Sequence, residues 1–411
     1  MIGTKYKQTE VGIIPADWDV TSIENTCNCY AGATPSTSNP NYWAGGNIPW
    51  MSSGEVNYRR IYATECHITK LGFDNSSTKW VPKHSVVMAL AGQGKTRGMV
   101  AINEIELCTN QSLCAIVPQS HLNYLYLYYN LYSRYNELRE ISGDARSGLN
   151  LFLIKNIHIP LPSSEEQKCI AQSLSDMDAL LVSLDKLIAK KKAIKQGSMQ
   201  QLLIGKQRLK GYDKPWVSFR IEELFDLGNG YTPSKEVASY WNNGTIPWFR
   251  MEDIRTNGRI LKDSIQHITK KAVKGGGLFP AGSFILSTTA TIGEHALLIA
   301  DSLANQQFTF LNRKVNRVSD IDQMFFFHYL FIIGDWCRAN INDGGLLAVN
   351  MTDLKNYECK IPPTLDEQCA IASILTDMDA EITELESKKA KYTAIKQGMM
   401  QQLLTGKIRL I

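Results

Sequence analysis

The chain has 411 residues, of which 44% are hydrophobic and 20% are charged, a composition that fits a folded globular protein and excludes a disordered or fibrous one. It is too long for one ordinary hydrophobic core, so two or more domains are expected. The net charge of +4 is compatible with a nucleic-acid partner but is too small to indicate one by itself.

Neither a membrane span nor a metal site is expected. The N-terminus has no basic segment followed by an apolar one, and the longest apolar run, 324–333, is interrupted by His328 and is too short to cross a bilayer. We therefore expect a cytoplasmic protein. The nine cysteines include no C-x-x-C pair and have no zinc spacing with the seven histidines, which predicts reduced thiols.

Residues 1–160 have the pattern of a domain with both helices and strands. Turn clusters at 32–40 and 92–98 separate short apolar runs such as 85–90 and 112–117. At 122–138, Leu and Tyr residues recur at helical spacing, which predicts a core helix.

Residues 161–210 are predicted to form one long helix. Ser163 or Ser164 can cap it, and Glu165 and Glu166 lie in its first turn. Apolar residues then recur at alternating steps of four and three, which is a heptad seam, at Ile170, Leu174, Met177, Leu181, Leu184 and Ile188. A helix of roughly 40 residues would be about 60 Å long.

The second half of the chain repeats the first. Thr34-Pro35, Tyr42-Trp43 and Trp50 recur about 198 residues later, and AIKQGSMQQLL at 193–203 recurs as AIKQGMMQQLL at 394–404. We expect a second mixed domain at 211–361, with a core helix at 323–337, and a second long helix within 362–411. Its heptad seam comprises Ile371, Leu375, Met378, Ile382 and Leu385.

The predicted fold class is α/β, in the mixed α+β sense. Two similar globular domains are separated by two long antiparallel coiled-coil helices, and the duplication is typical of a pseudo-two-fold symmetric molecule. The alternative is that each amphipathic helix lies on its own domain. The two matched seams favour pairing of the helices, and pseudo-two-fold symmetry suits duplex DNA.

The segment Lys7 to Pro15, KQTEVGIIP, followed by Trp18, resembles the N-terminal signature of the specificity subunits (HsdS) of type I restriction-modification systems. The resemblance covers the whole chain. It implies that 1–160 and 211–361 are target recognition domains, each reading one half of a bipartite sequence in double-stranded DNA. It also implies that the helices set the spacer between the halves and dock two methyltransferase (HsdM) subunits.

The same resemblance implies that endonuclease/translocase (HsdR) subunits join the complex, and that S-adenosylmethionine, ATP and Mg are bound by partner subunits and not by this chain. The motifs agree with a non-catalytic chain. Gly94-Lys95-Thr96 lacks the earlier glycine of a phosphate-binding loop, since Ala89 stands there, and Asn39-Pro40-Asn41-Tyr42 lacks the second proline of the adenine methyltransferase motif. We expect no catalytic and no metal-binding residues.

The glycine-rich segment 91–98, AGQGKTRG, resembles a loop common in these recognition domains. Its glycines would let backbone N–H groups approach DNA while Lys95 and Arg97 supply charge, whereas the alternative is a solvated hairpin turn. The second copy reads STTATIG at 287–293, as expected if the half-sites differ. The candidate DNA contacts are Lys70, Gln93, Lys95, Thr96, Arg97, Arg250, Lys270, Lys271, Lys274, Thr288 and Thr289.

The Trp pairs and the lysine clusters each allow more than one interpretation. The Trp pairs could stack on bases, but because both copies keep them we expect a packing role. The lysine clusters at 190–195 and 388–396 could form a solvated helix face, contact the DNA spacer or contact a partner. An alternative function is a free-standing or orphan DNA-binding scaffold that acts without methyltransferase partners.

Overall fold

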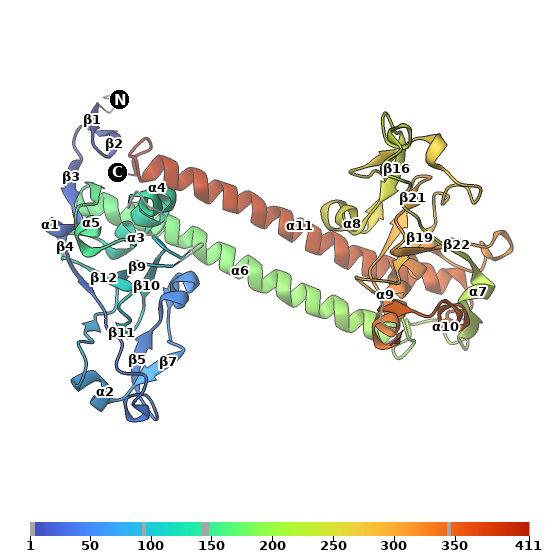
Figure 1. Ribbon diagram of the computed structural model, residues 1–411, viewed down its shortest axis with the longest axis horizontal. Helices are drawn as coiled ribbons and strands as arrows, with labels where there is room; N and C mark the ends of the chain where they lie inside the picture. The colour runs from blue at the N-terminus through green and yellow to red at the C-terminus, as the bar shows by residue number, and fades with distance from the viewer. Residues whose placement is uncertain (1–4, 93–95, 142–147, 343–346, 411) are drawn as a thin grey trace. The chain divides into compact units, whose positions relative to one another are not determined.

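The computed structural model describes residues 5–92, 96–141, 148–342 and 347–410. They form two compact units, the first made of Met1–Lys186 with Ser387–Ile411 and the second of Leu187–Glu386. We call them unit 1 and unit 2. Each contains one globular domain, the first part of one long helix and the last part of the other; these helices are α6 (Ser164–Leu202) and α11 (Leu365–Leu403), green and red in Figure 1.

The globular part of unit 1 is built on two sheets. The larger has the strand order β4 (Cys27–Ala31), β12 (Leu113–Pro118), β9 (Ser85–Ala89), β10 (Val100–Asn103) and β6 (Arg60–Ile61). The smaller has the order β7 (Cys66–Ile68), β5 (Ile48–Met51), β11 (Leu107–Thr109) and β8 (Trp80–Val81). Two antiparallel pairs accompany them, β1 (Tyr6–Thr9) with β2 (Gly12–Pro15) and β3 (Asp19–Ser22) with β13 (His158–Leu161).

Every residue of β9 is buried, because the larger sheet of unit 1 is covered on both faces. Val86 and Met88 face a core shared with helix α3 (Tyr124–Ser133) and the start of α6. Val87 and Ala89 face a second core shared with the smaller sheet. The continuous apolar run at 85–90 thus marks a strand buried on two sides.

Short helices and 3-10 turns connect the strands of unit 1. They are α1 (Ile23–Thr26), η1 (Pro40–Tyr42), η2 (Ser53–Tyr58), α2 (Lys70–Asp74), α4 (Tyr135–Glu140) and α5 (Leu151–Lys155). The core helix expected at 122–138 is confirmed as α3 followed by α4.

Unit 2 repeats the five-stranded order of the larger sheet, while its smaller sheet has three strands where that of unit 1 has four. Its larger sheet has the order β15 (Phe225–Asn229), β22 (Phe308–Arg313), β19 (Phe284–Ser287), β20 (His295–Leu298) and β17 (Ile260–Leu261). Its smaller sheet has the order β18 (His267–Ile268), β16 (Ile246–Phe249) and β21 (Leu303–Ala304), and β14 (Val217–Arg220) pairs with β25 (Glu358–Ile361). The remaining elements are β23 (Ile341–Asn342), β24 (Ala348–Val349), α7 (Ile221–Leu224), α8 (Met251–Asn257), α9 (Gln323–Ala339), α10 (Met351–Asn356), η3 (Ala238–Tyr240), η4 (Lys270–Ala272) and η5 (Val315–Arg317).

The two long helices confirm the heptad prediction. Each has 39 residues, which corresponds to about 58 Å at the α-helical rise. Ser163 caps α6, since its hydroxyl accepts a hydrogen bond from the backbone N–H of Glu166 at 3.2 Å. The core helix expected at 323–337 is confirmed as α9.

Within each unit the two helical segments run antiparallel, as expected. In unit 1, Asp185 pairs with Lys389 and Asp178 with Lys396, so residue numbers fall on α6 as they rise on α11. Unit 2 has the same geometry in the pairs Lys191–Glu381 at 2.6 Å, Lys192–Glu386 at 2.7 Å and Lys195–Asp379. Five lysines of the two clusters therefore bind the other long helix, an arrangement that none of the three expected alternatives included.

The seam residues are all buried or half-buried. Ile170 and Leu174 belong to the core of unit 1, and Ile371 and Leu375 to the core of unit 2, so the first turns of each helix lie on a globular domain. Leu184, Ile188 and Ile382 are buried further along the helices. The two expected alternatives therefore both occur: the first turns of each long helix pack on a globular domain, and the later stretches pair with the other long helix.

Two further observations concern the residues that the structure describes. No helix within the described ranges is long and apolar enough to span a membrane. All nine cysteines are free thiols.

Candidate nucleic-acid interface

The glycine-rich segment 91–98 connects two antiparallel neighbours, β9 and β10. Gln93 and Lys95 lie outside the described residues. Thr96 and Arg97 are half-buried, and the backbone N–H of Met99 donates to the carbonyl of Thr96 at 2.9 Å to close a turn. Residues 96–99 thus form a turn that leads into β10, and whether Thr96 and Arg97 contact DNA stays a prediction.

The divergent segment of the second copy occupies the equivalent hairpin, between β19 and β20. One expectation there is corrected. The Thr288 side chain is buried, with its hydroxyl 3.0 Å from that of Thr309 on the neighbouring strand β22, so it is not available on the surface. Thr289 is half-buried and forms a β-bridge with Ala348.

The four lysine candidates that the structure describes lie on the surface. Lys70 is exposed at the start of α2 and pairs with Asp74. Lys270, Lys271 and Lys274 are exposed in and after η4, and the Lys274 ammonium lies 4.7 Å from the ring centre of Tyr231. Exposed ammonium groups of this kind suit contacts to DNA phosphates, which orient a protein without reading sequence.

Arg250 stands apart from the lysines because it is half-buried. It forms an ion pair with Glu252 at 2.9 Å, and its guanidinium lies 5.9 Å from the ring centre of Trp248. Its Nε atom is buried without a hydrogen-bond partner among the described residues.

The Trp pairs have the packing role that the duplication predicted. Trp43 and Trp50 meet edge to face with ring centres 5.0 Å apart, and Trp241 and Trp248 do so at 5.1 Å. Trp50 and Trp248 are buried. In all four residues the indole N–H donates to a backbone carbonyl, so these rings are part of the scaffold.

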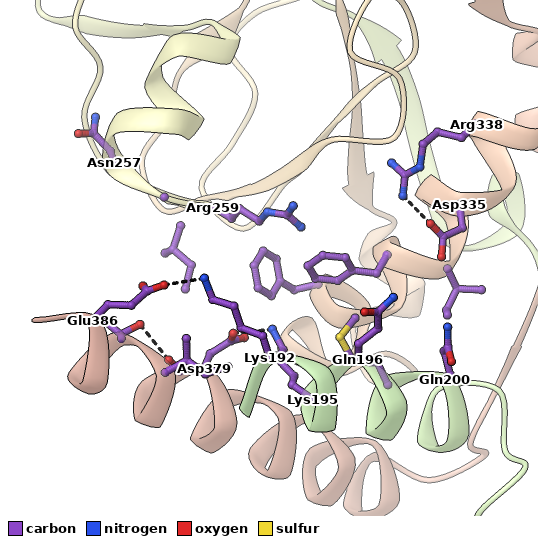
Figure 2. Close-up of a pocket in the computed structure, with 18 residues that line it drawn as sticks. Lys192, Lys195, Gln196, Gln200, Asn257, Arg259, Asp335, Arg338, Asp379 and Glu386 are labelled. Atoms are coloured by element: carbon purple, nitrogen blue, oxygen red, sulfur yellow. Dashed lines mark hydrogen bonds and ion pairs between the residues drawn. The ribbon is translucent and has the colours of Figure 1, made fainter. Parts of the chain in front are cut away.

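Sequence reasoning missed a groove that occurs in both units. In unit 2 it has a volume of about 870 Å³ and lies where α6, α11, α9 and the segment 257–260 converge (Figure 2). Lys192 and Lys195 with their carboxylate partners Glu386 and Asp379 line one side, and Arg259 lies opposite them. In unit 1 the equivalent groove has about 810 Å³.

The two grooves share residues position by position. Lys195, Gln196, Met199 and Gln200 of the repeated segment line one groove, and their counterparts Lys396, Gln397, Met400 and Gln401 line the other. The repeated segment AIKQG-x-MQQLL could have indicated these residues, but the sequence alone did not show that its two copies line grooves.

Each groove also has an arginine that lies over an aromatic ring. The Arg259 guanidinium is 4.3 Å from the ring centre of Phe331, and that of Arg59 is 5.0 Å from the ring centre of Tyr132. Burial lowers the pKa of Arg259, and Glu294, 3.0 Å away, opposes that shift. Nη1 of Arg259 is buried without a hydrogen-bond partner in the part of the chain that the structure describes.

Two buried histidines lie near this groove in unit 2. Burial lowers the pKa of His295 to about 3, with a smaller contribution from Arg259, and lowers the pKa of His328 to about 4, with a smaller contribution from Lys195. Among the residues that the structure describes, no group of three or more His, Cys, Asp or Glu side chains could hold a metal ion.

The fold recurs in solved structures of low sequence identity. The specificity (S) subunit of a type I restriction-modification system from M. genitalium matches with a TM-score of 0.58 and 14% identity, over 98% of this chain and 99% of that one. A chain from a structural study of complex assembly and conformational transition of the type I R-M system matches with a TM-score of 0.62 and 16% identity, over 96% and 99%. These matches define a class of proteins with two similar globular domains and two long helices.

The family itself follows from the sequence. The type I restriction modification DNA specificity domain matches residues 15–196 and again residues 213–396, so the chain belongs to that family.

Two curated relatives show different coverage. The type I restriction enzyme EcoprrI specificity subunit of Escherichia coli is 40% identical over 196 residues, and that alignment spans 48% of this chain and only 47% of the relative. The putative type I restriction enzyme MjaX specificity subunit of Methanocaldococcus jannaschii is 26% identical over 98% of this chain and 96% of its own length. The chain thus spans about half of the first relative and nearly all of the second.

Proposed function

We propose that the chain is the DNA specificity subunit of a type I restriction-modification complex and that each unit reads one half of a bipartite target. The observation that carries the proposal is that the two units share one scaffold, while the hairpins between β9 and β10 and between β19 and β20 differ in sequence. A common scaffold with different loops suits two half-sites of different sequence.

A domain exchange tests this proposal. Residues 1–160 are replaced by the corresponding domain of another specificity chain, and the methylated adenines in the DNA of cells that carry the whole system are mapped. We expect one half of the target to change and the other half and the spacer to stay. The matched control replaces residues 211–361 and changes the opposite half. A change of both halves in either exchange would contradict independent reading.

The long helices would set the spacer between the half-sites. The interhelical ion pairs and the buried seam favour a stiff pair of helices, whose length then determines the spacer. Seven residues inserted at equivalent places in α6 and α11 keep the heptad register and add about 10 Å, close to three base pairs at about 3.4 Å each. We expect the preferred spacer to lengthen by that amount. An unchanged spacer would rule the idea out.

The duplicated grooves would dock two copies of the same methyltransferase subunit. Half-sites differ, so DNA-reading residues differ between units, but a partner that is present twice needs the same surface twice. Gln196 and Gln200, like Gln397 and Gln401, are exposed in both grooves, and nothing in the fold described above requires them.

Native mass spectrometry of the assembled complex tests the docking. With Gln397→Arg we expect one methyltransferase per specificity chain, and with Gln196→Arg and Gln397→Arg together we expect none. The control is Lys190→Ala, which changes an exposed residue of α6 that does not line the groove. We expect this variant to keep two methyltransferase subunits per specificity chain. Two methyltransferases bound to the double variant would place the docking surface elsewhere.

In this proposal the chain is non-catalytic and works in the cytoplasm. S-adenosylmethionine would be bound by the methyltransferase subunits, and ATP and Mg by the endonuclease/translocase subunits. If the purified chain alone bound its target tightly at physiological salt, an orphan scaffold would be favoured instead, because phosphate neutralisation supplies much of DNA affinity and the net charge here is only +4.

A further inference from the structure

One exposed hydrogen bond recurs in both units. The Thr34 hydroxyl donates to Oε1 of Gln111 in unit 1, and the Thr232 hydroxyl donates to Oε1 of Gln306 in unit 2. Both threonines are half-buried and both glutamines are exposed. Because the threonine uses the carbonyl end of the amide, the two N–H donors of each glutamine are left for another partner.

In unit 1 the loop that carries Thr34 is fixed by indole groups. The Trp50 indole N–H donates to the carbonyl of Ala33 at 3.0 Å, and the Trp43 indole N–H donates to the carbonyl of Ser36 at 3.1 Å. The Trp pair therefore holds the loop on both sides of the threonine.

The loop of unit 2 is fixed in the same way. The Trp248 indole N–H donates to the carbonyl of Tyr231, and the Trp241 indole N–H donates to the carbonyl of Ser234, both at 3.0 Å. The packing role of the Trp pairs is thus to present Thr34 and Thr232 in one defined position each.

The glutamines are held as firmly as the threonines. Each follows an asparagine whose side chain closes a turn: Oδ1 of Asn110 accepts the N–H of Ser112, and Oδ1 of Asn305 accepts the N–H of Gln307, both at 3.1 Å. The turn at Asn110 packs directly against the loop that carries Thr34. A Cβ added to Gly32 would lie 2.0 Å from the carbonyl oxygen of Thr109.

A lysine accompanies each loop. The Lys274 ammonium lies over the ring of Tyr231, the residue before Thr232. In unit 1, Lys79 lies 5.7 Å from the ring centre of Tyr30 and follows Thr78, whose hydroxyl donates to the carbonyl of Ala33.

An exposed hydrogen bond contributes little to folding, so packing does not explain why both copies keep this one. The hairpins have diverged, whereas the threonine, the glutamine and a nearby ammonium group are present in each unit. Neutral amide donors, together with lysine ammonium groups on neighbouring segments, suit a phosphodiester backbone.

We propose that Gln111 and Gln306, each with its lysine, are equivalent contacts to the DNA backbone that fix the register of each recognition domain and read no base. This rests on the proposed function, since it requires DNA to be the ligand. The amide N–H groups of Gln111 and Gln306 would each donate to a phosphate oxygen at the corresponding half-site, and Lys79 and Lys274 would supply positive charge to the same DNA backbone.

The test uses the assembled complex with its methyltransferase subunits. For Gln111→Ala and for Gln306→Ala we expect affinity to fall about fivefold, equally for target DNA and for unrelated duplex, as for the loss of one hydrogen bond. For Lys79→Ala and Lys274→Ala we expect the slope of log affinity against log salt to fall by about one. The mapped methylation sequence stays unchanged in all four variants.

Gln119→Ala is the matched control, because the exposed Gln119 directly follows strand β12, whereas Gln111 precedes that strand. We expect this variant to bind DNA as the wild type does. Thermal unfolding confirms that each variant is folded. Affinities equal to that of the control would overturn the inference, as would a changed base preference in the corresponding half-site. A wild-type complex without affinity for duplex DNA would instead refute the proposed function.

Discussion

Arg409, near the end of the chain, binds the fully buried carboxylate of Glu166 in the first turn of α6, with Nη2 2.8 Å from Oε2. The Trp18 indole N–H donates to the same oxygen at 2.8 Å. Unit 2 contains the equivalent contact, in which Arg208 after the end of α6 binds Glu367 at the start of α11 at 2.7 Å. The residues after each long helix therefore anchor the start of the other one.

Removal of Arg409 should strongly destabilise unit 1. Arg409→Ala leaves the Glu166 carboxylate buried without its cation, which costs about 3–5 kcal/mol for a buried pair. Urea unfolding followed by hydrogen exchange of peptides from each unit measures the effect. The loss should appear in unit 1 only, and Glu166→Gln added to Arg409→Ala should recover part of it. Equal losses in both units would show that the contact does not act locally.

The interhelical pair Lys396–Asp178 should be worth more than a surface ion pair. Lys396 is buried and its ammonium also lies 5.5 Å from the ring centre of Tyr129, whose hydroxyl donates to Asp178 at 2.7 Å. We expect Lys396→Ala to lower the free energy of unfolding by roughly 2 kcal/mol, the scale of a hydrogen bond to a charged group. The control Lys391→Ala, at an exposed position of the same helix, should change it by less than about 0.5 kcal/mol.

Unit 2 should lose stability in mild acid. The pKa of His295 is lowered to about 3 and that of His328 to about 4, chiefly by burial, so both bind protons more readily in the unfolded chain. The stability they support is present above the unfolded pKa of about 6.5 and is lost as pH falls from there toward 4, by roughly 3 kcal/mol for each group at most.

Hydrogen exchange of α9 peptides between pH 7 and pH 4.5 checks this expectation, with α3 peptides of unit 1 as the internal reference. Val100 pairs with Met88 on β9 as His295 pairs with Leu286 on β19, and Tyr129 lies as far beyond the N-cap of α3 as His328 lies beyond the N-cap of α9. Val100 and Tyr129 therefore occupy the positions of the two histidines. His295→Val should therefore reduce the acid sensitivity of unit 2. An unchanged pH profile in that variant would assign the effect to other groups.

A chain that ends near residue 210 should form a dimer. The lysine near the end of each long helix and the arginine that follows the helix are the same in both copies. Lys195 can therefore pair with Asp178 of a second copy and Arg208 with its Glu166, as Lys396 and Arg409 do in the full chain. Sedimentation equilibrium measures the mass. Lys195→Glu in this fragment should favour the monomer. A monomeric wild-type fragment would show that the ion pairs of the full chain are not replaced by pairs between two copies.

The sequence predicted the repeating and periodic parts of the fold. Heptads identified α6 and α11, and the retained Trp pairs indicated a common scaffold. It could not predict the strand orders or the ion pairs, because Lys396 and Asp178 are distant in sequence and meet only once both helices are packed. Thr288 illustrates the same limit at the candidate site, since a polar loop residue is expected on the surface until the adjacent strand supplies Thr309 as a partner. The base-reading residues depend on loop conformations, for which the sequence contains no periodic signal.

The division of the chain has a consequence for synthesis on the ribosome. Unit 2 is one continuous stretch, Leu187–Glu386, whereas unit 1 needs Ser387–Ile411 in addition to its own N-terminal residues. Unit 1, whose N-terminal part is translated first, therefore completes its fold only after unit 2 has been translated, because the last part of α11 and Arg409 follow unit 2 in the chain. A nascent chain that stalls before residue 387 can therefore contain a complete unit 2 while unit 1 still lacks its C-terminal segment.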